Sequence, residues 1–181
     1  MKILIVVDMQ HDFIDGSLGS LEAQSIIPAV HTKVREYEAM ENSLIIYTQD
    51  THYEDYLETA EGKKLPIPHC IYESKGWEIV PQVMTRQHNT FTISKFTFGE
   101  EQLGKIIDDF VRNFNDNKPI ESVELCGVCT DICVISNALI AKAHWPQIPI
   151  MVDPSYCAGT TIARHDVAIE VMKSCQIDIL D

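Results

Sequence analysis

The sequence predicts an α/β fold, a three-layer sandwich in which a mostly parallel β-sheet has helices on both faces. Short, continuously apolar runs are typical of strands that are buried on both faces. Stretches with helical spacing separate these runs, and this alternation of strand and helix is typical of parallel sheets. The chain has 181 residues, of which 45% are hydrophobic, and this size suits a single domain over residues 1–181.

The predicted strands are apolar runs that recur along the whole chain. In order they are Ile3 to Val7, Leu44 to Thr48, Phe91 to Ser94, Ser122 to Gly127, Ile148 to Val152, and Ile177 to Leu180. The helices predicted between them begin at Pro28, cover residues 99–114, begin at Asp131, and cover residues 163–175. A long polar segment with several prolines follows the second strand.

Charge and the N-terminal segment exclude several classes of partner. The net charge of −13 and the pI of about 4.8 repel phosphate backbones and anionic lipids, so we expect no nucleic acid and no membrane partner. The apolar run near Met1 is too short for a secretory signal, and no stretch approaches the roughly 18 apolar residues of a membrane span. We therefore expect a cytoplasmic protein, whose thiols stay reduced.

Reactive side chains follow the ends of three predicted strands. Asp8 follows the first strand, Lys95 the third, and the cysteine-rich stretch "CGVCTDICV" begins within the fourth. Each of these residues alone can be explained as the polar boundary of a strand. Sites in parallel sheets lie outside the carboxyl ends of the strands, however, and an Asp, a Lys and a Cys together make a nucleophile with its activating groups.

The cysteine stretch allows three interpretations: a disulfide framework, a metal clip, or a nucleophile with two bystanders. A reducing compartment disfavours the first, and the lack of a second C-x-x-C pair disfavours the second. Cys126 lies within a strand and is expected to be buried. Cys133 falls in the first turn of the predicted helix, where the helix dipole and Lys95 would lower its pKa. Cys129, in the preceding turn, is the main rival.

A second group of side chains has the composition of a metal site. Asp50 and His52 follow the second strand, and His69 lies in the same long segment. One carboxylate and two imidazoles leave coordination positions open, which is typical of a working metal site. Glu58 or Glu61 could add an oxygen ligand. The alternative is that Asp50 caps a turn and that the histidines are ordinary loop residues.

Three segments, "LIVVDMQHDFIDGSL", "SKFTF" and "GVCTDICV", resemble the isochorismatase-like cysteine hydrolases over nearly the whole chain. The resemblance implies a Rossmann-like fold in which Asp8, Lys95 and Cys133 are catalytic, with Cys133 as the nucleophile. It also implies a non-proline cis peptide at Val128–Cys129, which would place the Cys129 and Cys133 amides as donors to an oxyanion.

Within that family, "DTH" and "PHC" are similar to the metal-binding segments of the nicotinamidases, also called pyrazinamidases. The resemblance implies one divalent ion, Zn or Fe, on Asp50, His52 and His69, with no organic cofactor, and Phe13 packing on the substrate ring. Nicotinamidases often have a tryptophan shortly before the histidine that corresponds to His69, and this chain has no tryptophan there. Candidates for its replacement are Trp77, Tyr53 and Tyr72, and the alternative is that the site has no such stacking partner.

The resemblance implies a cysteine amidohydrolase that converts a small amide such as nicotinamide to nicotinate and ammonia through a thioester, in NAD salvage. It also implies a homo-oligomer. One alternative is a hydrolase of a carbamoyl or ureido amide that uses the same triad. The other is a thiol- or metal-binding module on a retired hydrolase fold, which the intact triad disfavours.

Overall fold

The protein is described by a computed structural model covering residues 1–85, 89–114 and 118–180. Among these residues, six strands form one parallel sheet in the order β3-β2-β1-β4-β5-β6. The strands are β1 (Lys2–Val7), β2 (Ser43–Asp50), β3 (Thr90–Lys95), β4 (Ser122–Val128), β5 (Ile150–Ala158) and β6 (Asp178–Ile179). The four strands from β2 to β5 in this order form the buried centre of the fold.

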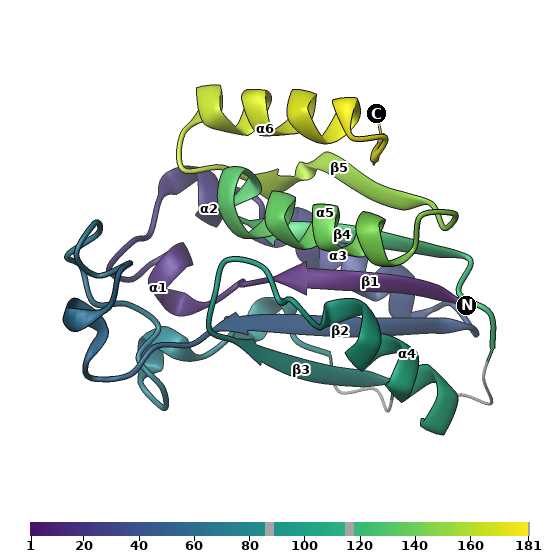
Figure 1. Cartoon of the computed structure of the whole chain (residues 1–181), viewed down its shortest axis with the longest axis horizontal. Coiled ribbons are helices and arrows are strands. Elements are labelled where there is room, and N and C mark those ends of the chain that lie inside the picture. Colours follow the sequence, from purple (N-terminus) through teal and green to yellow (C-terminus); the bar gives the residue numbers. More distant parts are fainter. Residues whose placement is uncertain (86–88, 115–117, 181) are drawn as a thin grey trace.

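Helices cover both faces of this sheet. In Figure 1, α4 (Leu103–Phe114) and α5 (Ile135–His144) lie in front of the sheet and α3 (Ile27–Glu38) lies behind it, while α6 (Ile162–Ser174) runs along the β5 side. The predicted three-layer α/β sandwich is therefore confirmed. Among the described residues, no helix is long and apolar enough to cross a membrane.

Several short helices lie beyond the carboxyl ends of the central strands (Figure 1). They are α1 (His11–Ile14), α2 (Leu21–Ser25), and the 3₁₀ turns η1 (Tyr56–Glu58) and η2 (Lys75–Trp77), while a third 3₁₀ turn, η3 (Pro81–Val83), packs against α3. None of them was predicted, because one turn is too short to show a helical period. Two of them begin at a serine cap: the Ser20 hydroxyl accepts a hydrogen bond from the Ala23 amide at the start of α2, and the Ser74 hydroxyl accepts one from the Trp77 amide at η2.

The fifth strand differs from its prediction. We expected it to end at Val152, with Asp153 and Pro154 following it at the carboxyl edge. The structure extends β5 to Ala158, so both residues lie inside the strand. The register against β4 shifts between Leu125 and Gly127, and such an irregularity accommodates a proline, which cannot donate to the strand ladder. Asp153 is therefore absent from the carboxyl edge.

The segment after β4 also begins differently from the prediction. The expected helix start at Asp131 is a π-helical turn, η4 (Thr130–Val134), which leads into α5. Its wide turn is closed by the Val134 amide, which donates to the Cys129 carbonyl five residues earlier at 3.1 Å. Single π turns occur often at functional sites, and this one carries Cys133.

Strand register aligns the carboxyl ends of β1, β2 and β3. Val7 pairs with Thr48, and Asp50 pairs with Lys95. The first residue after β1 and the last residues of β2 and β3 are therefore neighbours at one edge of the sheet, as the sequence predicts for a parallel arrangement.

Candidate active site

Lys95 is the centre of the candidate site. It is fully buried at the end of β3, and its Nζ atom lies 2.7 Å from Asp8 Oδ2, 2.9 Å from Asp50 Oδ1 and 3.5 Å from Cys133 Sγ. The structure thus brings together the three residues that the sequence proposes as catalytic. Burial alone would lower the pKa of Lys95, but the charges of its neighbours outweigh it and hold that pKa well above its usual value.

Asp8 is held rigidly where β1 ends. Its backbone adopts a left-handed conformation with φ 48°, which is uncommon outside glycine. Its amide donates to the Thr48 carbonyl at 3.2 Å, and the Thr48 hydroxyl donates to Asp8 Oδ1 at 2.7 Å. Complete burial raises the pKa of Asp8 against the opposing charge of Lys95, which makes this carboxylate a better proton acceptor.

The pKa of the Cys133 thiol is shifted in the opposite direction from the one expected from the sequence. The helix start and Lys95 were expected to lower its pKa, but burial, together with the charge of Asp8, raises the pKa of this thiol well above its usual value. That expectation is wrong because desolvation of a thiolate outweighs a single nearby ammonium group here. A thiol with a raised pKa needs a neighbouring base for its activation.

The turn that carries Cys133 contains the non-proline cis peptide expected at Val128–Cys129. Cys129 is half-buried and precedes the π turn, and burial raises the pKa of its thiol to about 12. Cys126 is fully buried in β4, as expected of a small hydrophobic residue. All six cysteines lie in the described parts of the chain and are free thiols, so the structure contains no disulfide framework.

Asp50, His52 and His69 converge next to this centre. All three are buried, and their ligand atoms lie within 4.8 Å of one another. Asp50 Oδ2 is 3.0 Å from His52 Nε2 and 3.6 Å from His69 Nε2. His69 Nδ1 lies 2.9 Å from the Ile67 carbonyl, and such a contact leaves Nε2 as the free ligand atom. Two imidazole nitrogens and one carboxylate are a donor set that zinc accepts, so the residues present fit a divalent ion.

Glu61, rather than Glu58, approaches this cluster. Its Oε1 atom lies 3.7 Å from both His52 Nε2 and His69 Nε2. Spacing in the sequence did not distinguish the two glutamates, since both belong to a segment without periodic structure. The η1 turn, which includes Glu58, and the loop after it place only Glu61 toward the histidines.

Asp50 belongs to both groups of side chains. One carboxylate oxygen contacts Lys95 and the other faces the two histidines. Burial would raise the pKa of Asp50, but the hydrogen bond to His52, the nearby His69 ring and the charge of Lys95 hold that pKa well below its usual range. The Asp50 carboxylate therefore connects the two histidines directly to Lys95.

Aromatic rings surround the histidines in an arrangement that the sequence did not show. Phe13 lies 5.5 Å from the His69 ring between centroids. Tyr56, which sequence reasoning missed, packs edge-on against His52 at 4.7 Å and against His69 at 5.0 Å. His52 and Tyr56 do not share a helix, so their spacing of four residues carried no signal of this contact.

The three candidates for the missing tryptophan form a row of their own. Tyr72 contacts Tyr53 at 6.0 Å and Trp77 at 5.1 Å between ring centroids. Tyr53 also stacks on Phe96, the residue after Lys95. Tyr53, Tyr72 and Phe96 are about half exposed, so this row forms an aromatic rim rather than a buried wall.

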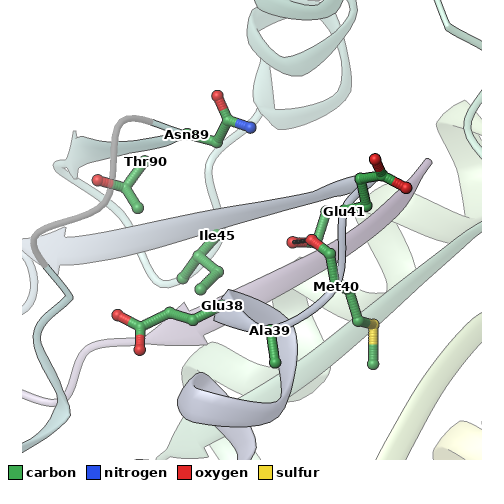
Figure 2. A pocket seen from close by; sticks show the side chains of 8 residues that line it. Glu38, Ala39, Met40, Glu41, Ile45, Asn89 and Thr90 are labelled. Atoms are coloured by element: carbon green, nitrogen blue, oxygen red, sulfur yellow. Dashed lines mark hydrogen bonds between the residues drawn. The ribbon is translucent and has the colours of Figure 1, made fainter.

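The opposite end of the sheet has a hollow without such convergence. A space of about 360 Å³ lies where β2 and β3 begin, lined by Glu38, Met40, Glu41 and Asn89 among others. Figure 2 shows the carboxylates of Glu38 and Glu41 directed away from each other. The hollow therefore has none of the features of the carboxyl edge, where charged groups meet around one thiol.

Comparisons with known proteins show which family the chain resembles in sequence and in fold. A family profile described as the isochorismatase domain matches residues 2–181. A nicotinamidase of Schizosaccharomyces pombe is 25% identical, covering 98% of this chain and 91% of the relative. A nicotinamidase/pyrazinamidase of Mycobacterium tuberculosis is 26% identical, covering 99% and 98%. The crystal structure of a pyrazinamidase of Pyrococcus horikoshii in complex with zinc is similar with a TM-score of 0.82 and 30% identity, covering 99% and 98%.

Proposed function

We propose, from the premise that this chain belongs to the isochorismatase family and is a hydrolase of C–N amide bonds, that it deaminates nicotinamide or a closely similar amide. The observation that carries the proposal is Lys95, a buried cation in contact with both a carboxylate and a thiol. A nucleophile, a base and a charge-stabilising group are then within reach of one substrate carbonyl.

The reaction begins with the transfer of the Cys133 proton to Asp8. Both pKa values are raised by burial, so the thiol and the carboxyl group compete for one proton beside a permanently charged Lys95. The thiolate sulfur attacks the amide carbonyl, and a C–S bond forms. The Cys129 and Cys133 backbone amides then donate to the oxyanion.

Collapse of this intermediate breaks the C–N bond. Asp8 returns the proton to the departing nitrogen, which leaves as ammonia, and a thioester remains on Cys133. Asp8 next takes a proton from a water molecule that attacks the thioester. The acid product leaves and the proton returns to the Cys133 sulfur, which restores the resting state.

We propose that Asp50, His52 and His69 hold one divalent ion, with Glu61 as a further oxygen ligand. Zinc is the favoured ion because two imidazoles and carboxylate oxygens suit it, and iron is the alternative. When bound, the ion would supply a Lewis-acid position for a neutral ring nitrogen. Phe13, beside His69, would pack against such a ring.

The substrate is tested by measuring ammonia release from four amides at one enzyme concentration: nicotinamide, pyrazinamide, benzamide and a small ureido amide. We expect the first two to react fastest, because benzamide has no ring nitrogen. The Cys133→Ala variant serves as the control for background release.

The other results of this panel lead to different conclusions. If benzamide reacts as well as nicotinamide, the ring nitrogen has no role. If only the ureido compound reacts, the carbamoyl-type hydrolase replaces the present proposal. If no amide releases ammonia although the protein binds zinc, the chain is a binding module and the proposed reaction is wrong.

We also propose that the protein acts in the cytoplasm as a homo-oligomer, without nucleic acid or membrane partners. Analytical ultracentrifugation of the purified chain measures the oligomeric state, and a sedimentation coefficient of a monomer at micromolar concentration would contradict it.

A further inference from the structure

We propose that Gln10 and Asp12 are positioning residues of the metal site: Gln10 holds the backbone of Asp50, and Asp12 holds the turn at His69 and Cys70. The inference rests on the proposed metal site. It assigns a role to the segment directly after Asp8, in which alternate residues each serve a different part of the carboxyl edge.

The Gln10 side chain takes the place of a strand partner for the backbone of Asp50. The ladder between β1 and β2 ends with the pair Val7 and Thr48, so Asp50, two residues further along, has no β1 partner on that side. The Gln10 side chain occupies this place. Its Oε1 accepts from the Asp50 amide at 2.8 Å, and its Nε2 donates to the Asp50 carbonyl at 2.9 Å.

These bonds hold a ligand through its backbone. Gln10 is fully buried, and its Nε2 also donates to the Trp77 carbonyl at 2.9 Å, so all of its hydrogen-bonding partners are protein groups. Backbone groups buried without partners are costly, and Asp50 would lose two partners if this amide were removed. Its carboxylate would then no longer be held at one position between Lys95 and the histidines.

Asp12 holds the backbone next to His69, the third proposed ligand. Its Oδ2 accepts from the Cys70 amide at 2.8 Å, and its Oδ1 accepts from the Ser17 amide at 3.2 Å. Cys70, which follows His69, has a left-handed backbone with φ 47°, a strained conformation for a residue with a side chain that persists only where its surroundings hold it. A Cβ atom at Gly76 would collide with the Asp12 carboxylate, so the fold leaves space for this contact.

Outer partners of metal ligands set the orientation of those ligands and thereby the affinity for the ion. Gln10 and Asp12 touch none of the proposed ligand atoms, and they act only through the backbone at Asp50 and Cys70. Removing them should therefore weaken metal binding by about 10- to 100-fold, the usual effect of losing an outer partner.

The experiment measures zinc affinity of the purified full chain by competition with a chromophoric chelator. The test variants are Gln10→Met and Asp12→Ala, each expected to bind zinc about 10- to 100-fold more weakly than the wild type. Asp12→Asn keeps an oxygen that can accept from the Cys70 amide and should restore most of the affinity. The matched control is Asp108→Ala, which removes a carboxylate that accepts from Trp145 Nε1 at 3.1 Å on the α4 side and should leave the affinity unchanged.

A second measurement separates positioning from loss of the fold. Thermal unfolding of the metal-free variants reports whether they fold, and the absorption bands of the cobalt-substituted protein report ligand geometry. If Gln10→Met does not fold, Gln10→Asn, which keeps the amide on a shorter side chain, is measured in its place and should also weaken zinc binding.

The possible results distinguish this inference from the proposal on which it rests. A wild-type chain that binds no zinc contradicts the proposed metal site. A wild type that binds zinc, with Gln10 and Asp12 variants that fold, bind equally tightly and give unchanged cobalt spectra, contradicts the positioning roles alone. Asp12→Asn and Asp12→Ala affinities that are equally low would show that the hydrogen bond to Cys70 is not the cause.

Discussion

In the described part of the chain, two clusters of buried charge differ in position: one lies at the carboxyl edge of the sheet and the other on its face. The edge cluster consists of Asp8, Asp50 and Lys95. The face cluster consists of Lys33 and Tyr37 from α3 and Glu124 from the middle of β4. In the face cluster, the Tyr37 hydroxyl donates to Glu124 Oε2 at 2.8 Å, and Lys33 Nζ lies 2.9 Å from Glu124 Oε1.

The two clusters differ in composition and in what they face. In the face cluster, one carboxylate is paired with two donors, and Lys33 also lies 4.4 Å from the centre of the Tyr156 ring. These side chains contact one another and thereby hold α3 against the sheet. The edge cluster places one cation between two carboxylates and beside a thiol. Burial of charge by itself therefore does not indicate a reaction; a charge shared between several acids and a nucleophile does.

The largest expected effect separates the two clusters by activity. Cys133→Ala removes the nucleophile beside the edge cluster, so ammonia release should fall by about 10³-fold or more. Tyr37→Phe in the face cluster and Cys175→Ser on the exposed surface should leave most activity. Steady-state rates with nicotinamide measure this. An active Cys133→Ala protein together with an inactive Cys129→Ala protein would move the nucleophile to the rival cysteine.

The two lysines provide the second test, by stability. Lys95→Met leaves two buried carboxylates without their cation, and such a loss costs about 3–5 kcal/mol of unfolding free energy. Lys33→Met leaves Glu124 with the Tyr37 hydroxyl, so its cost should be smaller, about 1–3 kcal/mol. Urea unfolding measures both variants, and amide hydrolysis should be lost only in Lys95→Met. Equal losses of stability would mean that the clusters do not differ in this way.

Metal content sharpens the comparison further, because Asp50 extends the edge cluster toward His52 and His69. Elemental analysis of the wild type should find about one equivalent of zinc or iron. His52→Ala should lose it, while His31→Ala, whose ring contacts the Gln82 carbonyl and not the metal cluster, should retain it. If the wild-type protein has full activity without metal, Asp50, His52 and His69 have a structural role instead.

The smallest effect belongs to the face cluster and depends on pH. Burial and the charge of Glu124 raise the pKa of Tyr37, and for Lys33 the attraction of Glu124 outweighs burial and also raises the pKa. Raised values mean that their stabilisation is complete below the unfolded values near about pH 10 and is lost as the pH rises through the folded values.

Urea unfolding at about pH 8 and about pH 11 tests this prediction, because the unfolded chain releases these protons first. The wild type should lose stability over this interval, and Tyr37→Phe should lose less of it. Tyr53→Phe, which removes an exposed hydroxyl, should behave like the wild type. Identical alkaline losses in the wild type and Tyr37→Phe would show that Tyr37 does not contribute to the pH dependence.

Much of the edge cluster could be predicted from the sequence, because its reactive residues stand directly after the apolar runs that form the strands. Asp8 and Lys95 directly follow or end apolar runs, and a parallel sheet brings such positions to one edge. Asp50 was recognised as a metal-type residue, but its contact with Lys95 was not, since it depends on the register that pairs these two residues. The face cluster was not anticipated, because Glu124 is a single polar residue within an otherwise apolar run.

The two errors have different causes, one a local irregularity of the strand ladder and the other burial in the assembled fold. The extension of β5 past Pro154 depends on the register shift beside it, and propensity alone disfavours proline in a strand. The expected low pKa of Cys133 took account of the helix start and Lys95 but not of burial. Exposure is a property of the assembled fold, and no pattern of neighbouring residues reports how completely a thiol is removed from water.

The sequence by itself determined the α/β class, the order of the reactive residues at the strand ends, and the residue types of a metal-type cluster. These follow from periodicity and from residue identity, which are local properties, while the cysteine hydrolase was implied by the resemblance to a known family. Only the tertiary structure decided that Asp50 joins the two groups, that Glu61 rather than Glu58 faces the histidines, and that Gln10 completes the strand ladder at Asp50. Each of these depends on contacts between segments about 40 residues apart or on a loop without periodicity, where distance in space cannot be inferred from distance along the chain.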